Sequence, residues 1–441
     1  MFTESAQRLR SAVPLLAQTT LLNETRNSVK HGAALSRVHG RRHFNVSPCL
    51  SVRYILDKVR TEKPQPHVKV EIPGLERITY ADRMHYIPGL SKPKFPTWER
   101  SYKDQQHYKC PKAEDMPLYK KKPCYVFHQR TNVVEGVKQA LWLTKSKMIK
   151  GLPAQVLSLA DDPANQIPNQ DEMVQNAIKH SRFWDTTEQR PPRQKFCLSL
   201  MRNLLHLCGG LQVRHPALGR RILAEKYSPV ATWSRGEELF QVRGQNGLLS
   251  SSTAPLPVLA GKEEVQGTVD HTLETFYPLS PTIDLSIIHL YQESNHTGFR
   301  GDYPYPHPHT LFFMEDGSTV KLLADQLRAK MIMFAFGNAL ARAHALYGSE
   351  AGELDRPVVV QAVGSNGRMF QYVILQLNTT SLQSDHGAKN LVWVEEDQEL
   401  YDYAKIRPLI RKKVVQVPAG LSGYQPETFR KFLSLYLHGA V

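Results

Sequence analysis

The stretch DQLRAKMIMFAFGNALARAHALY, residues 325–347, is apolar on almost every side between Ala329 and Ala341. A helix that is apolar all round is stable only when other elements cover it, so this stretch predicts a core helix. Lys330, Asn338 and Arg342 interrupt it well short of the roughly 20 apolar residues that a membrane-spanning helix needs. No other stretch comes closer to that length, and the sequence therefore predicts no membrane span.

Runs of β-branched and aromatic residues flank this helix on both sides and predict strands. They cover residues 283–291 and 310–314 before the helix, and 357–363 and 369–377 after it. Between the last two runs, Ser-Asn-Gly at 365–367 is a hairpin turn signal. The sequence therefore predicts an α+β fold, a mixed helix and sheet globule, for this part of the chain.

The preceding part of the chain is predicted to be mainly helical. Apolar residues at helical spacing predict helices over 132–151, 171–184, 195–207 and 216–227. Two short strands within 231–242 are followed by a Gly-, Ser- and Pro-rich stretch, 244–257, which is predicted to be a linker. A helix is also expected near 263–275, and a closing helix begins at Pro426.

The net charge of +15 over 441 residues is unevenly distributed. Residues 1–63 hold 11 Lys and Arg against 4 Asp and Glu, residues 64–150 hold 17 against 8, and residues 151–441 hold 28 against 29. A basic first third indicates a polyanionic partner, either nucleic acid or an anionic membrane. We expect four regions, namely a leader (1–60), an extended basic N-terminal strap (61–130), a mainly helical region (131–243) and an α+β region with the sheet and the core helix (258–441).

The leader has the composition of a mitochondrial transit peptide. Up to Arg53 it has two acids, Glu4 and Glu24, against eight Lys and Arg, with serines throughout. Its best apolar run, 13–22, is broken by proline and polar residues, which argues against a secretory signal. The composition indicates import into the mitochondrial matrix, and the alternative is a disordered basic tail.

Nine prolines from Pro64 to Pro123 exclude a long helix and predict an extended strap. Aromatic residues alternate there with cations, a composition that suits stacking on bases and pairing with phosphates. The candidate RNA-binding residues are Lys92, Lys94, Trp98, Arg100, Tyr102, Lys103, Tyr108, Lys109, Lys112, Lys120, Lys121 and Lys122. The alternative is that the aromatics dock the strap onto its own globule while the lysines face water.

No catalytic motif is present, since the sequence lacks GxxxxGK[ST], GxGxxG after a strand, GxSxG and HExxH. The dense histidine cluster at 303–309 offers two histidines without a third ligand at a recognisable spacing. We therefore expect no metal, no other cofactor and no small-molecule substrate. This loop and the apolar face of the closing helix are instead predicted to contact partner proteins. The candidate interface residues are Tyr303, Tyr305, His307, Phe429, Phe432 and Tyr436.

Seven longer sequence segments are more specific than the overall composition. They are EIPGLE (71–76), EGVKQALWLTK (135–145), HTLETFYPLSP (271–281), YPYPHPHTL (303–311), DQLRAKMIMFAFG (325–337), PVVVQAVG (357–364) and PETFRKFLSLYLHGA (426–440). Together they resemble the mitochondrial large ribosomal subunit protein thirty-seven family, which is related to the programmed-cell-death protein nine family. The resemblance covers the chain from about Glu71 to the C-terminus and leaves out only the leader.

This resemblance implies a structural component of the mitochondrial large ribosomal subunit in the matrix, with no catalytic residues. It implies contacts with large-subunit rRNA and with other mitoribosomal proteins, including the related programmed-cell-death protein nine. From the distribution of charge, deleting residues 64–122 is expected to abolish incorporation into the ribosome while leaving residues 130–441 folded. One alternative is a matrix enzyme on a degenerate α/β fold, which would need titratable groups converging in a pocket. The other is a peripheral membrane protein, which would need an amphipathic helix that the proline-rich strap cannot form.

Overall fold

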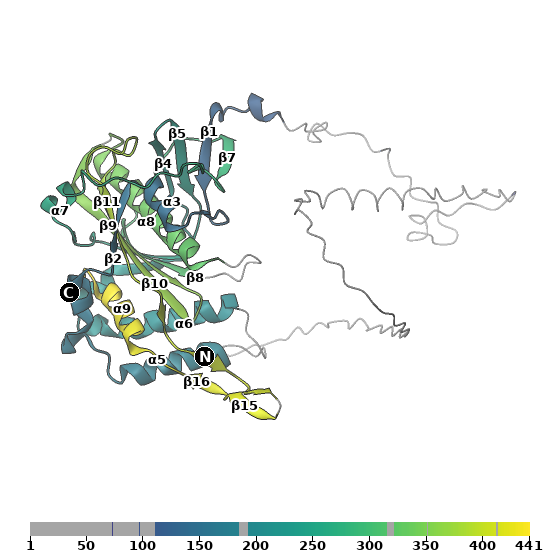
Figure 1. Ribbon diagram of the computed structural model, residues 1–441, viewed down its shortest axis with the longest axis vertical. Coiled ribbons are helices and arrows are strands. Elements are labelled where there is room, and N and C mark those ends of the chain that lie inside the picture. Colours follow the sequence, from purple (N-terminus) through teal and green to yellow (C-terminus); the bar gives the residue numbers. More distant parts are fainter. Residues whose placement is uncertain are drawn as a thin grey trace, which may run out of the picture. The chain divides into compact units, whose positions relative to one another are not determined.

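The computed structural model describes residues 73, 97, 111–184, 193–314, 322–350, 352–411 and 413–441. The chain divides into two units, Met1–Asp104 and Gln105–Val441. Every helix and strand given below belongs to the second unit (Figure 1).

The larger sheet has eight strands. Its order is β2-β11-β10-β9-β8-β6-β3, and β12 also pairs with β10. The β8–β9 and β2–β11 pairs are parallel and the others are antiparallel. The strands are β2 (Ser146–Lys150), β3 (Arg221–Ala224), β6 (Leu248–Ser252), β8 (His307–Met314), β9 (Glu353–Ser365), β10 (Met369–Thr379), β11 (Asn390–Val394) and β12 (Gln398–Glu399).

The smaller sheet has four strands in the order β4-β5-β1-β7. They are β1 (Tyr119–Phe127), β4 (Val230–Arg235), β5 (Glu238–Arg243) and β7 (Ser286–Leu290). β1 runs parallel to β5 and antiparallel to β7, so this sheet is also mixed. Together the two mixed sheets and the helices confirm the predicted α+β class.

The helices are α3 (Val137–Leu143), α4 (Ala154–Leu157), α5 (Gln170–Lys179), α6 (Arg193–Gly209), α7 (Lys262–Gln266), α8 (Ala324–Tyr347) and α9 (Pro426–Leu437). Shorter helical turns are η1 (Ala113–Asp115), η2 (Ser158–Ala160), η3 (Pro163–Asn165), η4 (His180–Trp184), η5 (Gly210–Val213) and η6 (Pro216–Arg220). Among the described residues, no helix is long and apolar enough to cross a membrane.

The long helix α8 lies between the two sheets (Figure 1). Phe334 is fully buried, and its ring centroid lies 5.6 Å from that of Phe127 in β1 and 6.1 Å from that of Phe313 in β8. On the same helix, a Cβ at Gly337 would come within 2.8 Å of the Val242 side chain in β5, so glycine allows close approach to the small sheet. A sheet covers the helix on each side, which explains the all-round apolar character of residues 329–341 and confirms the predicted core helix.

Alternate residues of the central strands face two separate cores. In β9, Val358, Val360 and Ala362 face α8, whereas Val359 and Val363 face the other side of the sheet. That second side is covered by α5, α6 and α9 (Figure 1). The layers are therefore the small sheet, α8, the large sheet, and a layer of helices.

Four segments differ from the sequence prediction. The helix expected near 263–275 is shorter, since α7 ends at Gln266. Residues 146–150 form β2 and not the end of a helix, because Lys145 has a φ of 49° that ends α3 and because β2 pairs in parallel with β11. Residues 221–224 and 248–252 form the paired strands β3 and β6, where a helix and a linker were predicted. The predicted division at 60, 130, 243 and 258 stays a prediction.

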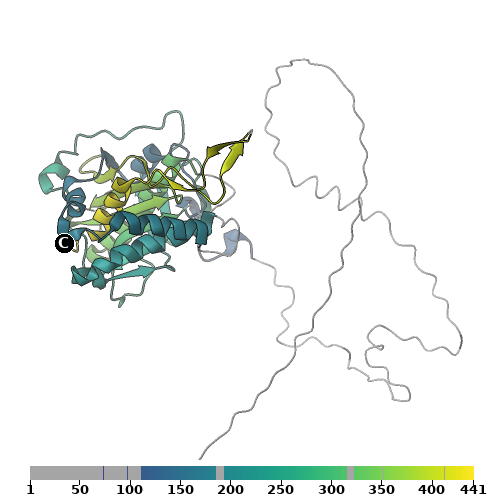
Figure 2. The ribbon, with the colours of Figure 1, turned by 90° about the horizontal axis from the view of Figure 1, so that it is seen from below.

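Two further pairs of short strands form an arm of the second unit. β13 (Tyr403–Lys405) pairs with β16 (Gly420–Ser422), and β14 (Leu409–Arg411) pairs with β15 (Val414–Val417). We call residues 403–422 the β arm. Its outer strands β14 and β15 project from the rest of the second unit (Figure 2).

Candidate interaction surfaces

Most of the candidate RNA-binding residues lie outside the described residues. They are Lys92, Lys94, Trp98, Arg100, Tyr102, Lys103, Tyr108 and Lys109. Their role in RNA binding stays a prediction.

The four remaining candidate cations lie at or near β1. Lys112, Lys121 and Lys122 are exposed, whereas Lys120 donates to Glu293 at 2.7 Å and lies 5.0 Å from the Tyr291 ring centroid. The hydrogen bond to Glu293 raises the pKa of Lys120. Because Glu293 already balances Lys120, the exposed lysines are better placed to meet a phosphate.

The end of the predicted strap is part of the fold. Residues 124–127 of β1 pair with β5, and the Tyr291 hydroxyl donates to the Lys122 carbonyl at 3.0 Å. The β1–β7 register shifts between Tyr119 and Cys124, a segment that contains Pro123. Such an irregularity is where a strand tolerates proline, which has no N–H to donate. From Tyr119 onward, the strap docks onto its own globule.

One tyrosine of the 303–309 loop stacks on the globule, and the other lies beside it at an angle. The Tyr303 ring lies 4.3 Å from the Phe299 ring at an interplanar angle of 5°, and Phe299 stacks in turn on Tyr227. Tyr305 lies 5.9 Å from Tyr303, and both tyrosines are half-buried. The loop therefore packs on its own chain and leaves part of each tyrosine available to a partner.

The two histidines of this loop have separate structural partners. His307 contacts Arg342 at 3.3 Å, and burial followed by the Arg342 charge lowers the His307 pKa to about 4. His309 is buried, and its Nε2 lies 3.0 Å from the His438 carbonyl just past α9. Burial lowers the His309 pKa well below its ordinary value, so the ring is neutral and donates to that carbonyl. No group of three or more metal-ligating side chains occurs among the described residues.

Two of the predicted interface residues of α9 are buried inside the chain. Phe429 is 0% exposed and Phe432 is 2% exposed, and both pack in the core between α9 and the large sheet. The chain's own core, and not a partner, covers this apolar face. Tyr436 is half-buried, and burial raises its pKa to about 12.

The C-terminal end of α9 is held by hydrogen bonds from three other elements. The Gln361 amide donates to the Leu435 carbonyl at 3.2 Å, and Arg221 donates to the Tyr436 and His438 carbonyls. His309 adds the bond described above. These donors satisfy carbonyls that have no partner within a helix. His309 therefore belongs to the packing of α9.

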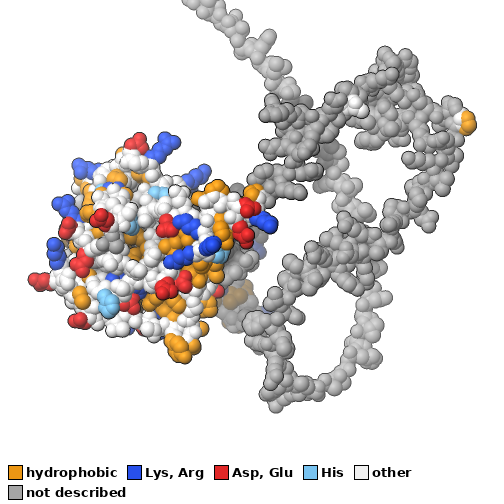
Figure 3. Space-filling view, turned by 90° about the horizontal axis from the view of Figure 1, so that it is seen from above, with side chains coloured by type: hydrophobic (Ala, Val, Ile, Leu, Met, Phe, Trp, Pro, Cys, Tyr) orange, Lys and Arg blue, Asp and Glu red, His pale blue; other side chains and the backbone are white. Residues whose placement is uncertain are grey.

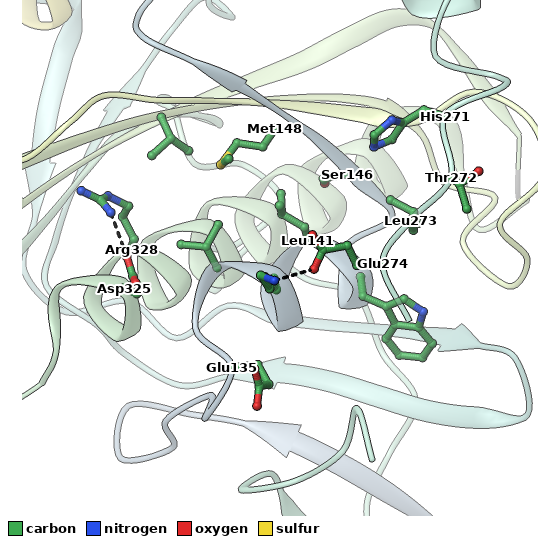
Figure 4. Close-up of a pocket in the computed structure, with 14 residues that line it drawn as sticks. Glu135, Leu141, Ser146, Met148, His271, Thr272, Leu273, Glu274, Asp325 and Arg328 are labelled. Atoms are coloured by element: carbon green, nitrogen blue, oxygen red, sulfur yellow. Dashed lines mark hydrogen bonds and ion pairs between the residues drawn. The ribbon is translucent and has the colours of Figure 1, made fainter. Parts of the chain in front are cut away.

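A pocket of about 510 Å³ lies among α3, β2, residues 271–274 and the start of α8 (Figure 4). Four of its charged side chains form two ion pairs, in which Lys138 lies 3.1 Å from Glu274 and Asp325 lies 2.9 Å from Arg328. Lys138, Glu274 and Asp325 are more than 60% exposed, and Figure 4 shows Glu135 and His271 on different sides of the pocket.

A group of buried cations, for which no sequence pattern provided a signal, holds residues 381–387. Lys145 donates to the Ser381 and His386 carbonyls at 2.8 and 2.6 Å, and Lys389 donates to the Gly387 carbonyl at 2.8 Å. Arg235 donates to the Trp142 and Leu382 carbonyls, both at 2.9 Å, and pairs with Asp385. Burial lowers the pKa of Lys145 and of Lys389. These cations serve the fold, because backbone carbonyls accept most of their hydrogen bonds.

The surface of the folded part mixes both signs of charge. Figure 3 shows Lys and Arg side chains interspersed with Asp and Glu side chains on one face. Buried polar groups tie the elements together, and exposed cations, half-buried tyrosines and the β arm remain for partners. These features describe an α+β protein with several candidate surfaces for interaction.

Comparison with known proteins identifies the family. The chain is 52% identical to large ribosomal subunit protein mL37 of Gallus gallus over 369 residues, which is 83% of this chain and 86% of the relative. It is also 52% identical to the mL37 proteins of Rattus norvegicus and Bos taurus, each over 385 residues, 87% of this chain and 91% of the relative. The chain therefore belongs to the mL37 family of mitochondrial large ribosomal subunit proteins, and the predicted resemblance is confirmed.

A second comparison concerns the related family. Residues 315–438 match the family model described as mitochondrial 28S ribosomal protein S30 (PDCD9). This span contains α8, the β9–β10 hairpin and α9, which form the centre of the large sheet and its two covers. The match agrees with the kinship to the programmed-cell-death protein nine family, whereas the assignment of the chain to mL37 rests on the relatives that it matches over most of its length.

Proposed function

We propose that this chain is a structural component of the mitochondrial large ribosomal subunit that supports mitochondrial translation by binding rRNA and neighbouring ribosomal proteins. The observation that carries the proposal is 52% identity to mL37 proteins over most of the chain. The proposal includes the absence of catalysis. The exposed ion pair between Lys138 and Glu274 in the pocket beside α3 supports that part of it.

Two kinds of contact supply the binding energy in this proposal. Cations of residues 61–122 neutralise rRNA phosphates and release counterions, while aromatic residues of the same region stack on bases or wedge between them. The folded unit contributes contacts to proteins, in which half-buried Tyr303, Tyr305 and Tyr436 pack against a neighbour. Each contact is weak, and their number gives a stable complex.

A protein of the programmed-cell-death protein nine family is the partner that we propose for the folded unit. The match at residues 315–438 supports this partner only through kinship, because related chains often pair through equivalent surfaces. We assign no residue to that contact.

The test is sedimentation of a mitochondrial matrix lysate through a sucrose gradient at about 0.05 and 0.2 M salt, with detection of this chain. We expect it to migrate with the large subunit at both salt concentrations, because buried protein contacts are screened much less than exposed charges. A free, light peak under both conditions would contradict the proposal and return attention to the enzyme alternative.

The strap deletion needs different limits from those that the sequence suggested. Deleting residues 64–122 would remove Tyr119–Lys122 from β1, together with the carbonyl to which Tyr291 donates. A deletion of residues 64–110 leaves β1 intact and tests the strap alone. We expect this shorter deletion to lose ribosome incorporation while keeping the circular dichroism spectrum of the folded unit. Normal incorporation would show that the strap is dispensable.

A further inference from the structure

The β arm is rigidly attached at its base. Ala404 is buried in the core beneath α9, and its carbonyl accepts a hydrogen bond from Arg182 at 3.2 Å. On the neighbouring chain segment, the Asp402 N–H donates to the Ser422 carbonyl at 3.0 Å. The direction of the arm is therefore set by the globule.

The outer part of the arm exposes aliphatic side chains. Ile406, Ile410, Val414 and Val415 are each at least 50% exposed. Ile410 pairs with Val415 across the ribbon, while Val414 pairs with the next position along, so apolar groups occupy both faces. A two-stranded ribbon is marginally stable by itself in water, and one with two apolar faces gains from a partner that covers it.

The arm also concentrates positive charge. Between Asp402 and Glu427 the sequence has five cations and no acid. The cations are Lys405, Arg407, Arg411, Lys412 and Lys413. They are five of the 28 Lys and Arg that residues 151–441 hold against 29 Asp and Glu, so the arm is a positive extension of an otherwise acidic region.

The tip of the arm holds a lysine in a backbone conformation that lysine rarely adopts. Lys413 follows β14 in the turn before β15 and has a φ of 64°, in the left-handed region that glycine and asparagine adopt more readily. The turn therefore accepts backbone strain while presenting an exposed charge. This is expected where the charge at the tip matters for binding.

These features favour RNA over protein as the partner of the arm. Lysine is depleted in protein–protein interfaces, and five cations without an acid would have to be neutralised by a strongly acidic patch. RNA supplies a phosphate every nucleotide, while its sugar and base faces can accept aliphatic side chains as wedges. We propose that the β arm is a second RNA-binding element, which inserts its cationic tip and aliphatic stem against large-subunit rRNA. This inference rests on the proposed ribosomal function.

The first experiment measures RNA binding by the full chain in solution. The probe is a fluorescein-labelled RNA stem-loop of about 30 nucleotides, titrated between 50 and 200 mM salt. The arm variant K405Q/R407Q/R411Q/K412Q/K413Q is compared with a control variant that removes five exposed cations elsewhere. The control is K150Q/K226Q/K262Q/R300Q/R356Q. Both variants lose five charges, so they differ only in where the charge is lost.

We expect the wild type to lose more affinity with salt than the arm variant does. If all five cations contact phosphates, the slope of log K against log salt concentration should be shallower by about 3.5 to 4.5 in the arm variant than in the wild type. Over that salt range, the arm variant should then lose roughly 100- to 500-fold less affinity than the wild type. The control variant should keep most of the wild-type slope. Equal slopes for the arm variant and the control would overturn the inference, provided that thermal melts show both variants folded.

The second experiment needs no variant and uses the assembled large subunit. Ultraviolet cross-linking is followed by digestion after glutamate, which releases the fragment from Leu400 to Glu427 that contains the whole arm. A nucleotide attached to this fragment supports the inference. A fragment free of nucleotide but joined to another protein by a lysine cross-linker would assign the arm to a protein partner. Failure of the proposed function is distinguishable, because the chain would then be missing from the purified subunit while the solution assay still reports on the arm.

Discussion

Replacing Phe334 by alanine tests whether α8 is the element that joins the two sheets. Phe334 is fully buried, and its ring contacts Phe127 of the small sheet and Phe313 of the large sheet. Removing it deletes one buried ring from the interface of three elements, and neighbours on two sheets cannot both move inward to fill the space. We expect Phe334→Ala to lower the free energy of unfolding by about 3–5 kcal/mol.

The measurement is urea unfolding of the full chain, followed by tryptophan fluorescence. Trp233 reports on the site, because its ring centroid lies 5.0 Å from that of Phe336, which follows Phe334 by two residues in α8. The matched control is Leu346→Ala near the end of α8, where the side chain is 44% exposed. This control should cost less than about 1 kcal/mol, since little buried surface is lost and alanine favours the helix.

A Phe334→Ala variant within about 1 kcal/mol of the wild type would refute the position of α8 between two sheets. A control that costs as much as Phe334→Ala would also refute it, because the effect would then reflect the helix itself and not its coverage.

Three further predictions concern close packing, buried charge and pH. Gly337→Val should destabilise the chain by about 1–3 kcal/mol in the same urea assay, since its side chain would overlap Val242, and an undiminished stability would show that the contact is loose. Arg235→Met should lower the free energy of unfolding by about 3 kcal/mol or more, because it leaves buried carbonyls without a donor. Asp385→Asn, at a side chain 54% exposed, should lower it by less than about 1 kcal/mol. Similar losses for both variants would count against a structural role of buried Arg235. Burial lowers the pKa of His309, so below about pH 6.5 the unfolded chain takes up a proton on this residue that the folded chain does not. The free energy of unfolding should therefore decrease as the pH falls from 7 toward 5, by up to about 1.4 kcal/mol per pH unit for this group. His309→Gln keeps a donor for the His438 carbonyl and should make that pH dependence shallower, and an unchanged slope would be evidence against a neutral His309.

Much of the fold could be predicted because its elements have strong local patterns. Residues 325–347, 171–184 and 195–207 form helices as predicted, since each has apolar residues at helical spacing over several turns. The strands around 357–377 and the Ser-Asn-Gly turn between them were also predicted from their local pattern. Gly367 in this turn has a φ of 88°, which is the positive φ that such a hairpin turn needs.

The candidate interface could be predicted less well, because a pattern of apolar residues does not say what covers it. Phe429 and Phe432 lie on the apolar face that the sequence indicates, but the large sheet of the same chain covers that face. His309 looks like a surface histidine beside prolines, yet it caps a helix 129 residues away. The β arm gave no sequence signal of its projection, which only the pairing of strands within 403–411 with strands within 414–422 reveals.

The family, the α+β class, the core helix and the uneven distribution of charge could all be read from the residues alone, because they depend on residue identity and on spacing within one element. The tertiary structure alone decided which strands pair, which apolar faces remain open and which cations are buried. Lys145 illustrates the difference, since its burial depends on carbonyls at Ser381 and His386, more than 230 residues further along the chain. Contacts over such separations are set by the packing of whole layers, and no local pattern encodes them.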